Sequence, residues 1–195
     1  MSSLNFCLRF DLRSEWHVGT GREGGAYADS LVLKDQHALP MLSGKSIKGL
    51  LRQAFHEALE LEWLKGADNQ TLTQLFGCEG VRAQAQGALR ISSATLSAAE
   101  IAYFTANPKD KGHLYLVRHA TAIDSHTGAA KEGSLRAMET VVPLVLHAQL
   151  ELNNASAEIQ QQFAHWLSIV LPLINSVGGK RRRGLGDVIV TVEEQ

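Results

Sequence analysis

Alternation of apolar and polar residues marks the ends of the chain as β-structure. Every second residue from 4 to 12 is apolar, which predicts a strand with one buried face. The same period of two recurs over 142–152, and a last strand is expected over 187–192. Shorter apolar runs that could add strands lie at 31–33, 88–92 and 114–118.

Apolar residues at spacings of three and four predict two amphipathic helices. The first runs roughly from 44 to 64, with Ser43 as a plausible N-cap. The second covers about 156–171, and Pro172 should kink or end it. Between these strong elements, the stretch from about 66 to 133 is irregular.

The strong elements read β, α, irregular β, then β, α, β. This order predicts an α+β, ferredoxin-like fold in which two helices pack on one face of an antiparallel sheet. We expect a single domain over 1–195, with the irregular middle as an insertion on that core. Within it, 122–133 is loop-like and 134–139 has no clear preference.

Composition describes an ordinary globular protein. The chain has 195 residues, of which 45% are hydrophobic and 20% charged. The chain has 19 Lys and Arg against 20 Asp and Glu, and its net charge of −1 gives no indication of a nucleic-acid partner. Evidence for such a partner must come from local clusters of positive charge. No signal peptide or membrane span is expected.

Cysteine and histidine patterns add little chemistry. The two cysteines, Cys7 and Cys78, have no CxxC spacing, which favours a reducing cytoplasm and predicts no zinc framework. The eight histidines form no HExxH motif and no tight cluster. The motif-like runs at 19–24 (GxGxxG) and 44–46 (GKS) lack the context that dinucleotide or Walker A sites need.

Four consecutive cations between paired glycines, over 178–186, form the most informative stretch. Glycine lets the backbone approach a ligand closely, and arginine offers a donor fork suited to phosphate. A solvated basic turn is the alternative. Lys45, Lys48 and Arg52 form a second basic stripe beside the apolar face of the first helix, and its alternative is a solvated helix flank.

Four segments, in order, together resemble the RAMP superfamily of CRISPR-associated proteins. They are the first strand with 17–21 and 28–30, the run 40–52, the run 123–130 with 139–143, and the basic glycine loop. Ser43 stands where the family usually has proline. The resemblance is closest to the repeating backbone subunit of type III effector complexes.

The resemblance implies a ferredoxin-like core with an inserted thumb at about 118–143 and a C-terminal glycine-rich loop. Copies of the subunit would stack along a guide RNA, beside other complex subunits and a target RNA. In such proteins the thumb inserts between base pairs, and the candidate apolar residues that would insert, called wedges below, are Ile123, Met138 and Val141. The implied RNA-binding residues are His17, Lys45, Ser46, Lys48, Arg52, Gly179, Lys180, Arg181, Arg182 and Arg183.

Asp29 matches an aspartate that target-cleaving members of the family require. The implied reaction is attack of a ribose 2′-OH on the adjacent phosphate with a divalent metal, expected to be Mg²⁺. Asp29 could hold the metal or take part in proton transfer. The alternative is that Asp29 only caps a turn, as many loop aspartates do.

Three functions therefore remain open. The chain could be an endoribonuclease subunit of a cytoplasmic type III CRISPR ribonucleoprotein that cleaves guide-paired target RNA. It could be a non-catalytic guide-RNA scaffold, or a capping RAMP subunit present in a single copy. The first of these is the leading expectation.

Overall fold

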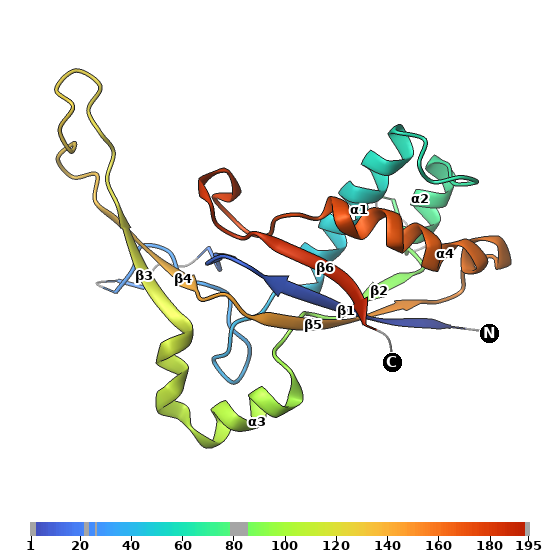
Figure 1. The fold of residues 1–195 in the computed structure, drawn as a ribbon, viewed down its shortest axis with the longest axis horizontal. Coiled ribbons are helices and arrows are strands. Elements are labelled where there is room, and N and C mark those ends of the chain that lie inside the picture. Colours follow the sequence, from blue (N-terminus) through green and yellow to red (C-terminus); the bar gives the residue numbers. More distant parts are fainter. Residues whose placement is uncertain (1–2, 22–23, 26, 79–85, 194–195) are drawn as a thin grey trace.

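A four-stranded antiparallel sheet, in the order β2-β5-β1-β6, organises the fold (Figure 1). The computed structural model describes residues 3–21, 24–25, 27–78 and 86–193. The strands of this sheet are β1 (Leu4–Leu12), β2 (Leu89–Ile91), β5 (Val145–Leu152) and β6 (Val188–Glu193). This strand order and the β-α-β-β-α-β sequence of the core confirm the ferredoxin-like α+β prediction.

Two helices, α1 (Gly44–Glu60) and α4 (Ala157–Val170), cover one face of the sheet (Figure 1). Each begins at a serine N-cap whose hydroxyl accepts a backbone N–H of the first turn, as predicted for Ser43. Their inner faces meet where the rings of Phe55 and Phe163 stack with centroids 6.2 Å apart.

Strand register explains which residues form the core. In β1, Leu8 lies opposite Ala148 and Phe10 lies opposite Leu146, and all four side chains are buried. The intervening residues of β1 point away from the helices because side chains alternate along a strand. The predicted alternation therefore selects the buried face correctly.

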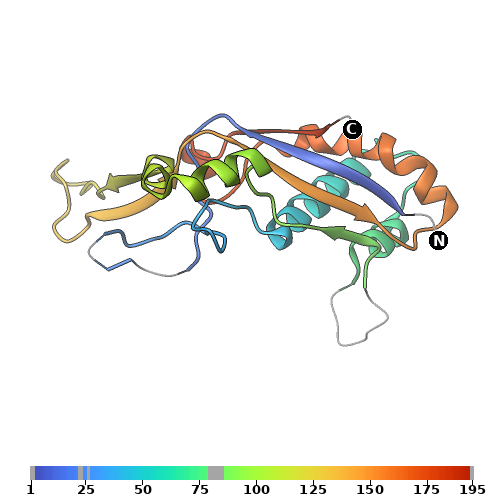
Figure 2. The same cartoon turned by 90° about the horizontal axis from the view of Figure 1, so that it is seen from below.

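A second, two-stranded sheet projects from the core as a long hairpin (Figures 1 and 2). Its strands are β3 (Tyr115–Ala120) and β4 (Arg136–Val141), paired with Arg118 opposite Met138. The segment 134–139, which had no clear preference, thus enters β4. Both chain termini lie at the opposite end of the molecule from this hairpin.

Three boundaries differ from the prediction. Helix α1 ends at Glu60 rather than near 64, because Glu62 adopts a left-handed φ of 56° and the Trp63 N–H returns to the Ala58 carbonyl. Strand β5 begins at Val145 because Pro143 cannot donate to a ladder. Residues 31–33 form no strand, and only Val32 among them makes an isolated bridge, with Gly19.

The irregular middle contains helices that the prediction did not include. They are α2 (Asn69–Phe76), α3 (Ala98–Ala106) and the 3-10 turn η2 (Pro108–Leu114). Short 3-10 turns also follow α4, as η3 (Leu171–Leu173), and lie in the basic loop, as η4 (Arg181–Arg183). Among the described residues, no helix combines the length and apolar character needed to cross a membrane.

Candidate nucleic-acid interface

The glycine-rich loop is a tightly closed turn that requires glycine at its base. Gly178 has a φ of +78°, and a Cβ there would lie 2.2 Å from the His17 carbonyl oxygen. Gly186 has the same φ, and its Cβ would lie 2.0 Å from the Val177 oxygen. The Val177 N–H donates to the Gly186 carbonyl at 2.8 Å and closes the loop. Larger residues at either glycine would force this base apart.

The cations of the loop point into solvent. Lys180 takes a left-handed φ of 56°, and η4 follows it directly. Within the described part of the chain, no carboxylate forms an ion pair with this group of four side chains. The exposed residues of the loop include Gly179, Lys180, Arg181, Arg182 and Arg183. The loop therefore offers an exposed cluster of positive charge that phosphate groups could approach.

A pocket of about 280 Å³ separates this loop from α1. Ser46, Gly49 and Gln53 line it from the helix, and Gly178 and Arg181 line it from the loop. The structure thus brings one predicted helix residue, Ser46, directly opposite the basic loop. The Ser46 hydroxyl lies 2.8 Å from that of the cap residue, Ser43.

The basic stripe lies on the other flank of α1. The Lys48 ammonium donates to the Leu89 carbonyl of β2 at 3.1 Å, and its pKa is lowered by burial and by the nearby Arg52 charge. Lys45 and Arg52 are exposed on the same side. The stripe and the loop therefore do not face each other across one groove.

Gly49 connects the two basic regions across the surface of α1. It lines both the pocket beside the loop and a shallower pocket that Arg52 lines. It is exposed, and a Cβ built on it would have no heavy atom within 4 Å. A polyanion that runs from Arg181 towards Arg52 could therefore approach the helix backbone closely at Gly49.

Asp29 is exposed and fixed against strand β4 of the hairpin. Its carboxylate Oδ2 accepts the Ala137 N–H at 2.7 Å, and its own N–H donates to the Ala137 carbonyl at 2.9 Å. The next residue, Ser30, accepts the Glu139 N–H at 3.0 Å. The loop that carries Asp29 is thus held along β4.

His17 joins the Asp29 loop, the hairpin and the glycine-rich loop. Its Nδ1 lies 2.6 Å from the Glu139 carbonyl oxygen and its Nε2 lies 3.0 Å from the Ser30 hydroxyl. A carbonyl only accepts, so Nδ1 carries the proton and Nε2 accepts from Ser30 in the neutral ring. The His17 carbonyl in turn accepts the Gly179 N–H at 2.8 Å.

This placement bears on the predicted RNA contact of His17. The side chain is only 7% exposed and both ring nitrogens have protein partners. A ring in this environment positions other segments and does not offer a nitrogen to RNA. Its nearness to Asp29 in sequence reflects a structural connection.

Glu139 is a buried charged residue whose role could not be predicted from the sequence. Its carboxylate is 1% exposed, and it accepts the Lys34 ammonium at 2.8 Å and the Val32 N–H at 3.0 Å. The Lys34 ammonium also lies 3.9 Å from the centre of the Tyr115 ring, and burial raises the pKa of Tyr115. Only its place in the 139–143 motif singled it out in the sequence.

A second ion pair attaches the hairpin to the segment that follows β1. The Arg118 guanidinium pairs with the Glu15 carboxylate, and this hydrogen bonding lowers the pKa of Glu15. The buried Thr140 hydroxyl donates to the same carboxylate at 2.9 Å.

Of the candidate wedges, Ile123 is 64% exposed near the tip of the hairpin, whereas Val141 is fully buried and is unavailable to insert between bases.

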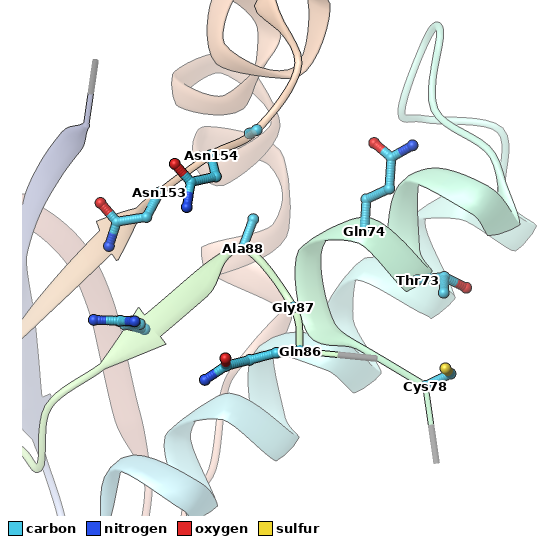
Figure 3. Close-up of a pocket in the computed structure, with 10 residues that line it drawn as sticks. Thr73, Gln74, Cys78, Gln86, Gly87, Ala88, Asn153 and Asn154 are labelled. Carbon is cyan, nitrogen blue, oxygen red and sulfur yellow. The ribbon is translucent and has the colours of Figure 1, made fainter. Parts of the chain in front are cut away.

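The pocket in Figure 3 differs in character from this region. It has a volume of about 360 Å³ and lies between α2 and the end of β5. Amide side chains of Gln74, Gln86, Asn153 and Asn154 line it, with Arg90 as its cation. Its polar, weakly charged lining does not match a phosphate-binding site.

Three features describe this fold. They are a ferredoxin-like sheet, a hairpin that projects from it, and a closed glycine-rich loop that carries four cations. The sequence matches the RAMP superfamily over residues 9–188, so the chain belongs to that superfamily. The comparison with curated proteins found no significant match.

Two similar solved structures come from a Type III-B Cmr-beta complex. A chain of the complex bound to cognate target RNA is 13% identical, with a TM-score of 0.69 and 97% of each chain covered. A chain of the apo state is 12% identical, with a TM-score of 0.69 and 98% of each chain covered. At this identity the likeness establishes a shared fold over nearly the whole chain.

Proposed function

We propose that this chain is a guide-RNA-binding subunit of a type III CRISPR ribonucleoprotein and that it cleaves guide-paired target RNA at Asp29. The observation that carries the proposal is the physical link between an exposed basic loop and an exposed carboxylate. His17 connects the two, since its carbonyl holds Gly179 and its ring holds Ser30, next to Asp29. Membership of the RAMP superfamily and the Cmr-beta-like fold support it.

The basic loop would hold the guide through its phosphates. Charged and backbone donors bind phosphate without reading bases, which suits a subunit that leaves sequence selection to base pairing. From the loop, the guide would cross α1 at Gly49 towards Lys45 and Arg52. The target strand, copies of this chain and other complex subunits are the further partners.

Asp29 would supply the chemistry. One of its oxygens accepts the Ala137 N–H, which fixes the carboxylate beside the hairpin. Among the described residues, no set of three His, Cys, Asp or Glu ligands gathers around it. A single carboxylate suits Mg²⁺, which takes its remaining ligands from phosphates and water. Bound there, Mg²⁺ would neutralise charge on the scissile phosphate.

The hydrogen bond from the Ala137 N–H to the Asp29 carboxylate favours a second candidate function, a guide-RNA scaffold in which Asp29 is structural. Asp29→Asn separates the two, because the amide oxygen can still accept the Ala137 N–H while the charge is lost. We expect the assembled complex with Asp29→Asn to bind guide and target normally and to lose target cleavage. Asp68→Asn is the matched control, since Asp68 caps α2 and asparagine caps equally well.

The outcomes are distinct. Normal cleavage by Asp29→Asn would reject catalysis and leave the scaffold. One copy of the chain per guide, measured by native mass spectrometry, would indicate a capping subunit.

The guide-binding half of the proposal has its own test. Arg182→Glu should weaken guide binding and reduce its salt dependence, with a slope change of roughly 0.7 for each lost phosphate contact. The exposed Lys109→Glu on η2 is the control. Unchanged binding by Arg182→Glu would reject the loop as the guide contact.

A further inference from the structure

Three potential metal ligands meet on the face of the sheet that α1 and α4 leave uncovered. Cys7 lies on β1 and is opposite Glu193 of β6, while His147 lies on the neighbouring β5. All three alternate with core residues along their strands and are only partly buried. His147 and Glu193 each lie at least 140 positions from Cys7 in the sequence, so no short motif could indicate that the three meet.

The ligand atoms already lie at nearly the spacing a metal needs. Cys7 Sγ lies 3.2 Å and His147 Nδ1 3.1 Å from the same carboxylate oxygen of Glu193. All three ligand atoms lie within 4.8 Å of one another. Tetrahedral zinc with these ligand types separates them by about 3.4–3.6 Å. The two distances to Glu193 would therefore lengthen by a few tenths of an ångström, and Sγ and Nδ1 already lie within 4.8 Å of each other.

Charge and ligand type select the metal. A thiolate, a carboxylate and a neutral imidazole carry a charge of about −2, which balances Zn²⁺. The nearby Arg9 is already paired with Asp11 at 3.2 Å, so its charge is partly compensated. Sulfur and imidazole nitrogen favour zinc over Mg²⁺, which prefers oxygen ligands.

We propose that Cys7, His147 and Glu193 form a zinc site with a fourth position open to water. The ion would replace the hydrogen-bonded protons that now link the three side chains. It would join the edge strand β6 to β1 and β5, and β6 directly follows the glycine-rich loop. This site is separate from Asp29 and does not depend on the proposed nuclease function.

The test is metal titration of the full chain. Protein is stripped with a chelator under reducing conditions and titrated with Co²⁺ and Zn²⁺. We expect one ion per chain, a thiolate-to-cobalt charge-transfer band, the intense visible bands of tetrahedral Co²⁺, and a rise in the midpoint of thermal unfolding with zinc.

Variants assign the ligands. Cys7→Ser should remove the charge-transfer band and weaken zinc affinity by more than about 100-fold, because even second-shell changes cost about 10- to 100-fold. Cys78→Ser, at the other cysteine, should leave both unchanged. Glu193→Gln and His147→Ala should also weaken binding, while the exposed His165→Ala should not.

Three results would overturn the proposal. They are a stoichiometry well below one ion per chain, a charge-transfer band that survives Cys7→Ser, and equal affinity in the wild type and Glu193→Gln. Circular dichroism of each metal-free variant checks that its fold is intact. If Cys7→Ser does not fold, Glu193→Gln and His147→Ala decide the question.

Discussion

The ion pair of Lys34 and Glu139, in which only the carboxylate is fully buried, provides a direct test of how the Asp29 loop is attached to the hairpin. The ammonium and carboxylate are 2.8 Å apart, and the Glu139 side chain is 1% exposed against 32% for Lys34. Lys34→Met removes the positive charge and keeps most of the side-chain length. It leaves the Val32 N–H as a hydrogen-bond donor to a buried carboxylate.

The expected loss of stability follows from that burial. Removing one partner of a fully buried pair costs about 3–5 kcal/mol. Water reaches Lys34, so we expect about 2–3 kcal/mol, of which about 0.5–1 kcal/mol reflects the lost contact of the ammonium with the Tyr115 ring. For a chain of this size, that loss lowers the midpoint of thermal unfolding by roughly 5–10 °C.

Urea denaturation of the two single variants and the double variant measures the pair itself. Glu139→Gln keeps an acceptor for Val32, so Lys34→Met/Glu139→Gln should be more stable than the sum of the single losses predicts, by about 1–2 kcal/mol. Lys109→Met, at an exposed site, should change stability by less than about 0.5 kcal/mol. A comparably small effect of Lys34→Met would refute the reasoning, since it would mean that Glu139 does not need its partner.

Two further predictions concern α1 and the hairpin. Gly49→Ala should stabilise the protein by about 0.5–1 kcal/mol in urea denaturation, because the site is an open helix position, whereas the bulkier Gly49→Gln should weaken guide binding in a filter assay. Since Arg118 holds the pKa of Glu15 below its ordinary value, their pair should stabilise the protein above the pKa that Glu15 has when unfolded and lose this effect as pH falls through the lower folded pKa. Wild type and Arg118→Met should therefore differ in stability at pH 7 and converge in acid; a constant difference would contradict this assignment.

Hydrophobic periodicity predicts the core of this fold because five of its elements each bury one side. They are β1, α1, β5, α4 and β6. The strand from Leu4 and the helix after Ser43 are examples, and in both the pattern is long and regular. Helix α3 could not be found in this way, because none of its residues is buried. Its capping box between Ser97 and Glu100 was the readable signal.

The candidate site was predictable only in part. The basic loop is local in sequence, so its charge and its glycines could be read directly. The direction of Lys48 could not, because it depends on a carbonyl of β2, 41 residues away. The roles of His17 and Glu139 depend on contacts more than 100 residues apart, which no spacing rule reveals.

The attachment of the Asp29 loop and the proposed grip on RNA respond differently to salt. His17 joins its segments through backbone groups and the hydrogen bonds of a buried imidazole ring, which salt screens weakly. The cations at 180–183 are exposed, so their attraction for phosphate falls steeply as ionic strength rises. Added salt should therefore release RNA while Asp29 stays in place beside Ala137. For this reason, a loss of cleavage at high salt would report on guide and target binding, and only a substitution at Asp29 or its supports would report on the reacting group.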